Sequence, residues 1–486
     1  MSSSAPRFDP ERLRLTLADA LPRETDEKPE PRHLYVPPRH ARALSPDNSL
    51  VVGIRGAGKS VWWRALQSPD YRHVAAAALA SPALDEISEV AAGFGETLRP
   101  YDYPDKRVLR QILRAGRSPA EIWRTVVAVH TWARTAESAL GTLDNWAERV
   151  AWMEENPEKA AHAFKAHDDD LAARRKLQLV LFDALDRVAD DWSDLRQLLR
   201  GLLEVLLELR GFRGIRAKAF VRPDMLDDPQ VTAFRDASKV LAGKVELRWP
   251  RADLYGLLFQ RLGNAEEGAA FRSGCEALGS GRWPETDGVW QVPKTLREDE
   301  DLQRTTFHDM AGPWMGTDRK RGFPYTWLPN HLGDAAEQVS PRSFLWALRT
   351  ATEERVPGGW SHALHYDGIK RGVQEASRIR VDEVREDFFW VPTVMDPLRG
   401  LAVPCQFSAV GKRWKKADVL SRLRAAEGGS DSGLLPKRMG QGHVGLRDDL
   451  LDLALFSRQK DGRINMPDVY RVGFGLGRRG GVKPIR

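Results

Sequence analysis

The fold of this 486-residue chain is decided by the stretch Gly53-Ile54-Arg55-Gly56-Ala57-Gly58-Lys59-Ser60. It satisfies the pattern G-x-x-x-x-G-K-[ST], in which the backbone N–H groups of a glycine-rich loop surround the phosphates of a nucleotide. An apolar run at Ser49–Val52 precedes it and predicts a buried strand, and Val61–Gln67 continues as a helix. This strand, loop and helix context predicts a functional P-loop rather than a chance match.

The residues of this stretch predict how ATP and Mg²⁺ are held. Lys59 supplies a positive charge to the β- and γ-phosphates, and Ser60 offers its hydroxyl oxygen to Mg²⁺. The helix that starts near Gly58 adds its N-terminal dipole to the same anion. The expected nucleotide-binding residues are Gly53, Arg55, Gly56, Ala57, Gly58, Lys59, Ser60 and Val61.

A second strand carries the acid that such a site needs. Leu177–Phe182 reads as a buried strand and delivers Asp183 at its end, where a carboxylate would reach Mg²⁺ through the water shell of the ion. Asp186 is a candidate to orient or deprotonate the attacking water, and the alternative is a structural acid at a helix start. Ser60 and Asp183 are therefore the expected metal ligands, and Lys59, Asp183 and Asp186 the expected catalytic residues.

Further apolar runs continue the alternation of strands and helices. Strands are predicted at Arg72–Ala80, Ile215–Val221 and Lys244–Trp249, and helices at Asp191–Leu209 and Ala252–Leu262. Such alternation is typical of a parallel sheet with helices on both faces. The expected fold class is an α/β P-loop NTPase with a long helical insertion, a helical lid and a small C-terminal module.

Length and composition predict four parts, because a chain of this length exceeds one ordinary domain. They are an N-terminal helix and linker (1–34), the ATPase core (35–262, with the helical insertion at 84–176), an irregular insertion and helical lid (263–396), and a basic C-terminal module (397–486). In the third part Gly, Pro and Trp interrupt Ser273–Gly322. Helices are expected at His331–Val339 and Pro341–Glu354.

The positive charge of the chain is concentrated in its last part. The segment from Pro397 contains 18 Lys and Arg against 8 Asp and Glu, whereas the whole chain has a net charge of +6. Two helices, at Ala417–Ala425 and Gly445–Phe456, and a tight turn at Asp461-Gly462 are compatible with a winged-helix module. Lys412-Arg-Trp-Lys-Lys416 and the tail at 477–486 would suit a nucleic-acid backbone. A solvated basic face and a docking tail for a protein are the alternatives.

Composition also argues against several classes of protein. The two cysteines, Cys275 and Cys405, exclude a disulfide framework and fit a reducing cytoplasm. Neither an apolar run long enough to span a membrane nor a signal peptide is evident, so we expect a cytoplasmic protein without membrane contact. His362 and His365, with Asp367 nearby, lack a further ligand group and predict surface residues rather than a zinc site.

The sequence resembles several groups of ATPases over roughly residues 35–348. LVLFDALDRV (179–188) resembles the second acidic motif of STAND-type and KAP-type P-loop NTPases, and AKAFVRPDML (217–226) is similar to the strand-end Arg-Pro of the STAND sensor motif. KVELRWPRADLYGLLFQRL (244–262) resembles the last strand and the lid-helix start of AAA+-related ATPases. SPRSFLWAL (340–348) is similar to the lid motif of origin-recognition-type ATPases.

The resemblance implies roles for arginines. Arg222 would sense the γ-phosphate from a strand end and Arg342 would approach the nucleotide from the lid, since a guanidinium stabilises charge on the phosphoryl oxygens. The alternatives are a loop residue and a solvated helix residue. Arg187 stands where many STAND proteins carry a second acid, which leaves the water-activating group open, and it could instead pair with Asp190 or Asp191.

The resemblance further implies an ATP-driven switch, in which lid closure favours assembly as a homo-oligomer or with an effector protein, with prokaryotic antiphage defence among its roles. One alternative is a DNA-binding initiator or loader that uses the C-terminal module. A second is a scaffold that binds ATP with negligible turnover. The segment Tyr35–His40 would cover the adenine or serve as an extended linker.

Overall fold

The computed structural model describes residues 7–24, 29–79, 84, 86–134, 138–426, 435–478 and 482–484. It divides into two compact units. The core unit is Pro38–Leu247, and the flanking unit combines Met1–Pro37 with Arg248–Arg486. The helix α13 (Arg251–Gly263), which the sequence placed at the end of the ATPase core, therefore belongs to the flanking unit.

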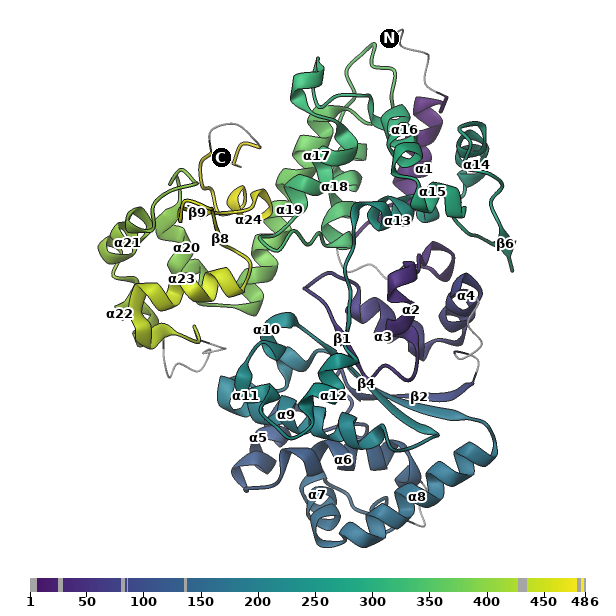
Figure 1. Cartoon of the computed structure of the whole chain (residues 1–486), viewed down its shortest axis with the longest axis vertical. Helices are drawn as coiled ribbons and strands as arrows, with labels where there is room; N and C mark the ends of the chain where they lie inside the picture. Colours follow the sequence, from purple (N-terminus) through teal and green to yellow (C-terminus); the bar gives the residue numbers. More distant parts are fainter. Residues whose placement is uncertain are drawn as a thin grey trace. The chain divides into compact units, whose positions relative to one another are not determined.

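A five-stranded parallel sheet forms the centre of the core unit (Figure 1). In the order β2-β3-β4-β1-β5, its strands are β2 (Ile87–Phe94), β3 (Leu177–Phe182), β4 (Ile215–Val221), β1 (Leu50–Val52) and β5 (Val245–Glu246). The bounds of β3 and β4 are those predicted from the sequence. This order places β4 between the strand that carries the glycine-rich loop and the strand that carries Asp183.

Helices cover both faces of the sheet. They are α2 (Ala41–Leu44), α3 (Lys59–Gln67), α4 (Pro69–Leu79), α5 (Lys106–Arg114), α6 (Pro119–His130), α7 (Trp146–Glu155), α8 (Pro157–Ala173), α9 (Trp192–Leu209), α10 (Pro223–Leu226), α11 (Pro229–Thr232) and α12 (Ala237–Ala242). The crossover from β1 to β2 runs across the sheet in the opposite direction from all later ones. Right-handed connections therefore place α3 on one face and α6 and α9 on the other, as Figure 1 shows.

The second strand is not where the sequence predicted it. We predicted a strand at Arg72–Ala80, but the described part of this segment lies in α4, because its alanines favour helix. The strand is β2, at the edge of the sheet and inside the segment 84–176 that we predicted to be helical. Gly93 permits its close approach to β3, since a Cβ there would lie 2.6 Å from the ring of Phe182. The helical insertion is therefore formed by α5 to α8.

The flanking unit contains helices packed around a large apolar core. Its elements are α1 (Pro10–Ala20), α13, α14 (Gly268–Ala277), the hairpin of β6 (Glu285–Thr286) and β7 (Val289–Trp290), α15 (Lys294–Glu298), α16 (Glu300–Ala311), α17 (Pro324–Leu332), α18 (Pro341–Glu353) and α19 (Tyr366–Asp387). Leu17 of α1 lies in the same core as Tyr255 and Phe344. The N-terminal helix thus packs with helices that follow it by more than 200 residues.

Two predictions in the flanking unit are corrected. The segment Ser273–Gly322 is not irregular throughout, since α15 and α16 lie within it and Asp299 caps the start of α16. The helix predicted at His331–Val339 lies earlier, as α17, and ends at Leu332 before Gly333. Proline and tryptophan had indicated irregular structure, but here Pro324 starts a helix, a position that proline favours.

A second apolar core marks the C-terminal module of the flanking unit. The elements of the module are α20 (Val391–Met395), α21 (Phe407–Lys416), α22 (Val419–Ala425), α23 (Gly442–Asp452), β8 (Ser457–Arg458), β9 (Ile464–Asn465) and α24 (Asp468–Arg471). β8 and β9 form an antiparallel hairpin, and Cys405 pairs with Ile464 as a third antiparallel segment. Helices followed by a small hairpin are the arrangement that the sequence predicted for this module.

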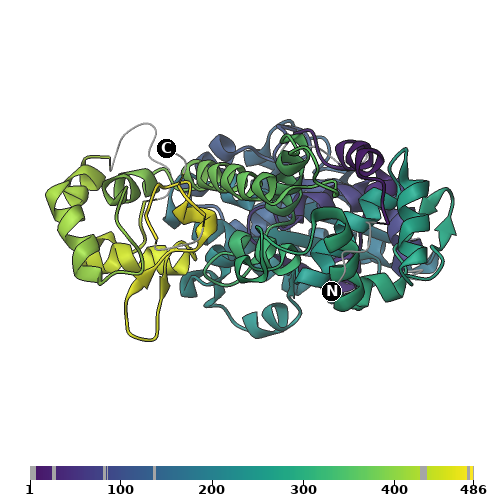
Figure 2. The same ribbon diagram turned by 90° about the horizontal axis from the view of Figure 1, so that it is seen from above.

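Helix α19 joins the two cores of the flanking unit, and both ribbon views show it running from the lid helices to the C-terminal module (Figures 1 and 2). Its first half contributes Ile369 and Val373 to the larger core, and its last turns contribute Val381 and Val384 to the core of the module. With 22 residues it is about 33 Å long. One continuous helix therefore connects the lid to the module.

Two further expectations concern the cationic tail and membrane-spanning helices. Of the cationic tail at 477–486, residues 479–481, 485 and 486 lie outside the described part of the chain. Within the described residues, we find no helix that is both long enough and apolar enough to cross a membrane.

Candidate functional site

The glycine-rich loop connects β1 to α3 at the carboxyl end of the sheet. The carbonyl oxygen of Val221, the last residue of β4, accepts a hydrogen bond from the N–H of Gly53 (3.1 Å). Gly56 and Gly58 have φ angles of 75° and 100°, a left-handed conformation that favours glycine. Helix α3 starts at Lys59, directly after Gly58. The loop therefore has the curled backbone and the helix N-terminus that bind phosphate groups.

The side chain of Lys59 lies over its own loop. Its Nζ donates hydrogen bonds to the carbonyl oxygens of Gly53 (2.7 Å) and Ile54 (3.0 Å). Burial lowers the pKa of Lys59 to about 8, an effect that the carboxylate of Asp183 opposes and the guanidinium of Arg222 reinforces. A lysine ammonium has three donors, so it can keep both loop contacts and still donate to a phosphate oxygen.

Asp183 lies directly after β3, with 4% of its surface exposed. Burial raises the pKa of its carboxyl group, and hydrogen bonds from the Ser60 hydroxyl and the Ala184 N–H oppose that shift. Ala184 has a φ of 54°, so the chain turns sharply after the acid. The oxygens of Ser60 and Asp183 fit Mg²⁺, which takes few protein ligands and completes its shell with phosphate and water oxygens.

Arg222 follows β4 and completes the cluster. Its Nε and Nη2 donate to the two carboxylate oxygens of Asp224, at 3.0 and 2.8 Å. Its Nη1 lies 3.9 Å from Oδ2 of Asp186, and the arginine side chain is 11% exposed. Arg222, Asp183 and Asp186 all influence the pKa of Lys59, so the predicted residues of the core unit share one electrostatic site.

Asp186 lies beside Arg222 and does not cap helix α9. It lies in a short 3-10 turn, Leu185–Arg187, and its side chain is about one-third exposed. The N-cap of α9 is Asp191, whose carboxylate accepts a hydrogen bond from a backbone N–H of the first turn. Asp191 therefore caps α9, whereas Asp186 is an acid in the first turn of its own short helix, and its catalytic role stays a prediction.

Arg187 pairs with an acid that sequence reasoning missed. Its guanidinium lies 3.8 Å from Glu96, two residues beyond the end of β2. Asp190, one of the partners considered from the sequence, instead binds Lys106 (2.8 Å) and Arg110. Glu96 could not be identified as the partner of Arg187 from the sequence because its strand had not been located.

Asp224 was also missed, although the sequence contains a signal for it. In Arg222-Pro223-Asp224 the acid falls in the first turn of α10, where the helix dipole favours a carboxylate. Proline starts the helix and lets the acid face back toward the arginine two residues before it. An acid shortly after a strand-end arginine therefore predicts a fixed guanidinium.

The remaining predicted residues lie outside this cluster or in the other unit. Arg342 is in the first turn of α18 and pairs with Glu383 (2.5 Å). Tyr35 is buried in the core of the flanking unit, whereas His40 is buried in the core unit with its ring edge-on to Trp62, 6.0 Å between centroids. The role of Arg342 in the lid and a role of these aromatic residues near adenine stay predictions.

His362 and His365, which lie close together in the sequence, each have a hydrogen-bond partner in the backbone. Nδ1 of His362 is 2.9 Å from the carbonyl oxygen of Asp309. Nδ1 of His365 accepts a hydrogen bond from the N–H of Asp367 and so caps α19. Within the described residues, no group of three or more His, Cys, Asp or Glu side chains could hold a metal ion.

Comparisons with known proteins add little to this geometry. No protein-family model and no curated protein matches the sequence. Among solved structures, the chain is similar to the ORC2 protein of Aeropyrum pernix in its ADPNP–ADP complexes, with 14% identity over 92% of this chain and 93% of that chain and a TM-score of 0.42. The ADP form of ORC2 gives 14% identity, 94% and 93% coverage and a TM-score of 0.31.

Cdc6p of Pyrobaculum aerophilum is similar at 11% identity over 97% of this chain and 93% of that chain, with a TM-score of 0.28. TM-scores of this size carry no argument, and none of the three structures is named as a STAND or KAP ATPase. The assignment rests instead on the strand order and the residues at one edge of the sheet. On that ground the core unit has the fold of a P-loop NTPase.

Proposed function

We propose that this chain binds ATP with Mg²⁺ and hydrolyses it at the carboxyl edge of the core sheet. The observation that carries the proposal is the convergence of Lys59, Asp183 and Arg222 from β1, β3 and β4. Phosphoryl transfer needs a cation on the phosphates, an acid that holds the metal and a cation for the charge on the γ-phosphoryl group. The three residues supply these parts.

Each side chain has a distinct task in this proposal. Lys59 neutralises the β- and γ-phosphates, while Ser60 and Asp183 hold Mg²⁺, the acid acting through water. Burial raises the pKa of Asp183, and Mg²⁺ held there would favour the charged form of its carboxylate. Arg222, oriented by Asp224, stabilises charge on the γ-phosphoryl oxygens.

Asp186 is the proposed residue that orients the attacking water. Its partial exposure leaves room for water, and Arg222 beside it would place it near the γ-phosphate. The second acid on that arginine, Asp224, is less suited because both of its oxygens already accept hydrogen bonds. Asp186 is therefore the acid with capacity to accept a proton or a water hydrogen bond.

The decisive test is Lys59→Ala, assayed by phosphate release from Mg²⁺-ATP. We expect the rate of hydrolysis to fall by at least about 10³-fold. A fixed positive charge that faces the negative charge developing on the phosphoryl group has effects of this size. The matched control is Lys165→Ala, an exposed lysine of the same unit that pairs with Asp169. Turnover of Lys59→Ala at the control rate would contradict the proposal. ATP binding without turnover by the unaltered chain would favour the scaffold alternative.

We further propose duplex DNA as the partner of the C-terminal module. Lys412, Lys415 and Lys416 are spaced by three and four residues, which places them on one side of α21, and all three are exposed. Among the described residues, no ion pair involves them. On the opposite side Trp414 is buried, and its Nε1 donates to the carbonyl oxygen of Val394 (2.6 Å). The lysines are thus presented on an anchored helix.

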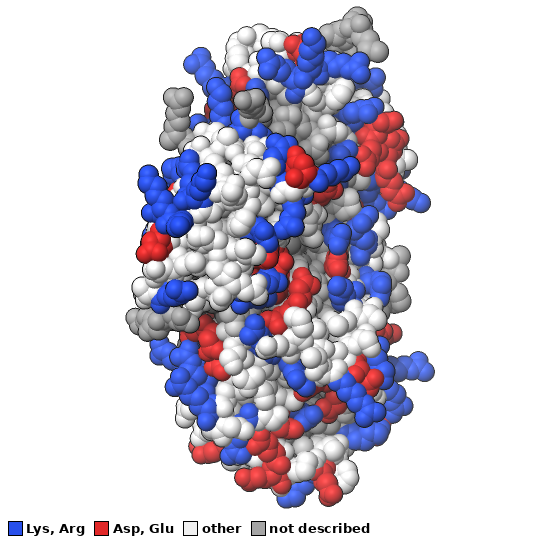
Figure 3. Space-filling model, turned by 60° about the vertical axis from the view of Figure 1, so that its left-hand side comes forward, with Lys and Arg blue, Asp and Glu red and all other residues white. Residues whose placement is uncertain are grey.

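The neighbouring helix α23 is less suited to DNA. Arg447 is occupied by Asp448 (2.8 Å), and Asp452 by Arg438 (2.5 Å). On the face that Figure 3 displays, Lys and Arg are interspersed with Asp and Glu and do not form one continuous basic surface. The three exposed lysines of α21 favour contacts with phosphates rather than with base edges.

Salt dependence tests this second proposal. Changing Lys412, Lys415 and Lys416 to alanine should weaken binding to a DNA duplex and reduce the slope of log affinity against log salt by about 3, roughly one per phosphate contact. The control instead removes three exposed cations of α8 and its C-terminal cap: Lys159, Lys165 and Arg174. Equal slopes for the two triple variants would contradict DNA binding by these lysines. They would favour a solvated basic face or a protein partner instead. No observation on this chain supports the antiphage role that the resemblance implied.

A further inference from the structure

The loop between α16 and α17 concentrates positive charge in the flanking unit. Arg319, Lys320 and Arg321 follow one another in a 3-10 turn, and all three are exposed. Within the part of the chain that the structure describes, no ion pair involves any of them. The acid of this loop, Asp318, accepts a hydrogen bond from the N–H of Lys320 (2.8 Å) and so caps the turn. We call residues 316–322 the cationic loop, because its three cations outnumber its one acid.

The backbone of the cationic loop is held in one shape. Its ends meet where the N–H of Met315 donates a hydrogen bond to the carbonyl oxygen of Gly322 (2.9 Å). Gly322 has a φ of 89°, a conformation that favours glycine. A Cβ on Gly316 would lie 2.7 Å from Cγ of Arg321, so the stem of this arginine packs across the loop. The cations therefore stand on a closed loop whose backbone need not be ordered when a partner binds.

A buried methionine and an aromatic stack fix the loop to the larger apolar core of the flanking unit. Met315 is 1% exposed and belongs to that core. The ring of Phe323 is stacked on that of His308, 5.8 Å between centroids, and the centroid of Trp314 is 4.9 Å away. Burial and the charge of Arg304 lower the pKa of His308 to about 4, so this ring is neutral at neutral pH. The charge of the loop therefore comes from Arg and Lys side chains, which do not titrate there.

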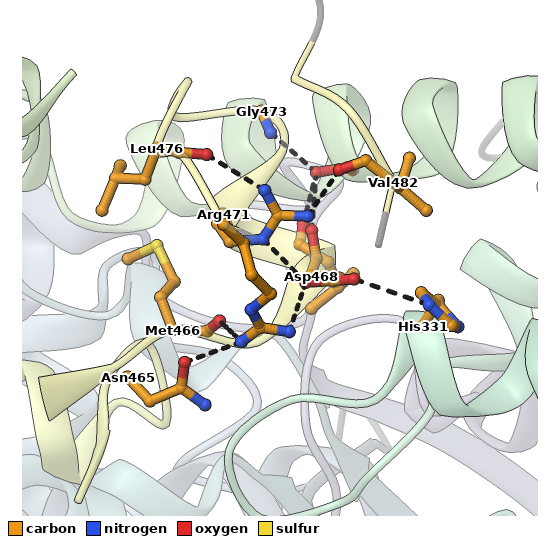
Figure 4. A network of polar contacts seen from close by, with 11 residues as sticks. His331, Asn465, Met466, Asp468, Arg471, Gly473, Leu476 and Val482 are labelled. Atoms are coloured by element: carbon orange, nitrogen blue, oxygen red, sulfur yellow. Dashed lines mark hydrogen bonds and ion pairs between the residues drawn. The ribbon is translucent and has the colours of Figure 1, made fainter. Parts of the chain in front are cut away.

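Helix α17 connects the cationic loop to the C-terminal module. It starts at Pro324, two residues after the loop, and His331 lies in its last turn. Nε2 of His331 is 3.7 Å from Oδ2 of Asp468 at the start of α24. Asp468 also accepts hydrogen bonds from Arg471 (2.7 Å) and Arg478 (2.8 Å), in the polar network that Figure 4 shows. A short helix with a polar contact at its far end thus joins the loop to the module.

We infer that the cationic loop binds backbone phosphates of duplex DNA, as a second contact outside the C-terminal module. The inference rests on the proposed function, in which DNA is the partner of α21. A duplex carries closely and regularly spaced charges, so neighbouring cations of one turn can each meet a phosphate. The forked guanidinium groups of Arg319 and Arg321 match phosphate oxygens.

The composition of the loop favours DNA over an acidic protein. A protein interface depends on a few aromatic or apolar side chains that become buried at its centre. The cationic loop contains only glycine, threonine and charged residues, so it offers no such anchor. Its contacts with DNA would go to the backbone and would not depend on base sequence.

The first test measures the salt dependence of binding to a short DNA duplex. Changing Arg319, Lys320 and Arg321 to alanine should weaken binding and lower the slope of log affinity against log salt by about 3, roughly one per phosphate contact. The matched control removes three exposed cations of the same unit that pair with acids: Lys294, Arg304 and Arg371. A slope of the loop variant equal to that of the control would overturn the inference.

Two milder changes separate the charge of the loop from its shape. The pair Arg319→Lys and Arg321→Lys keeps the charge and should keep the slope. Asp318→Asn removes the acid but keeps an oxygen that caps the turn, so DNA should bind about threefold tighter, the size of an effect of one exposed charge. The control Asp301→Asn removes an exposed acid that pairs with Arg304 and should change the affinity less. Weaker binding by Asp318→Asn, or a lower slope in the lysine pair, would overturn the inference.

Combining the loop and α21 variants distinguishes the two proposals. Because distant sites act independently, the chain that carries both triple changes should lose the sum of the two slopes. A slope that falls only with the α21 changes would overturn the inference and leave the proposed partner of the module standing. A slope that falls only with the loop changes would support the inference and contradict the proposal for α21.

A competition experiment checks the class of partner. Polyglutamate offers carboxylates without the regular spacing of a duplex, so at equal charge it should displace DNA from the unaltered chain poorly. Binding of polyglutamate as tight as that of DNA, and lost in the loop variant, would overturn the inference in favour of an acidic protein.

Discussion

The two arginines expected to meet the γ-phosphate are held in different ways. Arg222 in the core unit is held by Asp224, two residues away, through two parallel hydrogen bonds. Arg342 in the flanking unit is held through one nitrogen by Glu383, 41 residues away on another helix. The charge of each guanidinium is compensated by a carboxylate. A carboxylate within the same turn fixes the orientation of the arginine, whereas a carboxylate on another helix links two helices. We therefore predict a catalytic role for Arg222 and a coupling role for Arg342.

Replacing each of the two arginines by alanine should give the largest difference in kcat. Arg222→Ala should lower kcat by about 10³-fold, because a guanidinium on the γ-phosphoryl oxygens has effects of this size. Arg342→Ala should lower kcat by about tenfold and act mainly on the preference for ATP over ADP. Steady-state phosphate release and nucleotide titration measure the two effects. Equal losses of kcat in both variants would show that the arginines share one role.

Replacing the two carboxylates should give effects of different size on kcat. Asp224→Asn should lower kcat by about 30-fold, since Arg222 keeps its charge but loses its fixed orientation. Glu383→Gln, which neutralises an acid of the flanking unit, should leave kcat close to that of the unaltered chain. The control for the first change is Asp47→Asn, an exposed acid that pairs with Arg216 near the start of the same strand, β4. A kcat of Asp224→Asn equal to that of Asp47→Asn would show that the orientation of Arg222 does not depend on Asp224.

The smallest predicted effect is the pH dependence of ATP binding, which distinguishes the charge of Lys59 from the charges of the arginines. Burial lowers the pKa of Lys59 to about 8, so its charge, which phosphates require, is present below pH 8 and lost above it. ATP affinity should therefore be about tenfold weaker at pH 9 than at pH 7. Arginine does not titrate in this range, so Lys59→Arg should remove the dependence. A pH profile that is unchanged in Lys59→Arg would place the titrating group elsewhere.

Local sequence signals predicted the centre of the fold and of the site. Lys59 and Ser60 follow from one eight-residue pattern, and Asp183 follows from a buried strand that ends in an acid. β2 was missed because it lies at the sheet edge, where Ser88 is exposed, and because the alanine run before it resembled a buried segment. An edge strand needs fewer apolar residues than a central one, so its pattern is weaker.

Long-range packing could not be predicted from one sequence. Leu17 and Tyr255 share a core, although no local pattern connects them. The partner of Arg342 was missed for the same reason, since a contact across 41 residues depends on how α18 and α19 pack. Asp224, by contrast, was within reach of sequence reasoning because its contact is local. The sequence thus predicted charged residues better than their partners.

The shared helix α19 has a consequence for how this protein can be divided. A fragment that begins at Trp390 would lack Val381 and Val384, which complete the apolar core of the module. It would also lack Ser377, whose hydroxyl accepts a hydrogen bond from Gly473 N–H at a point where a Cβ on the glycine would lie 2.8 Å from the backbone oxygen of Ser377. The module therefore does not form a complete folding unit by itself. Its separate expression, or its exchange between proteins, requires the whole of helix α19.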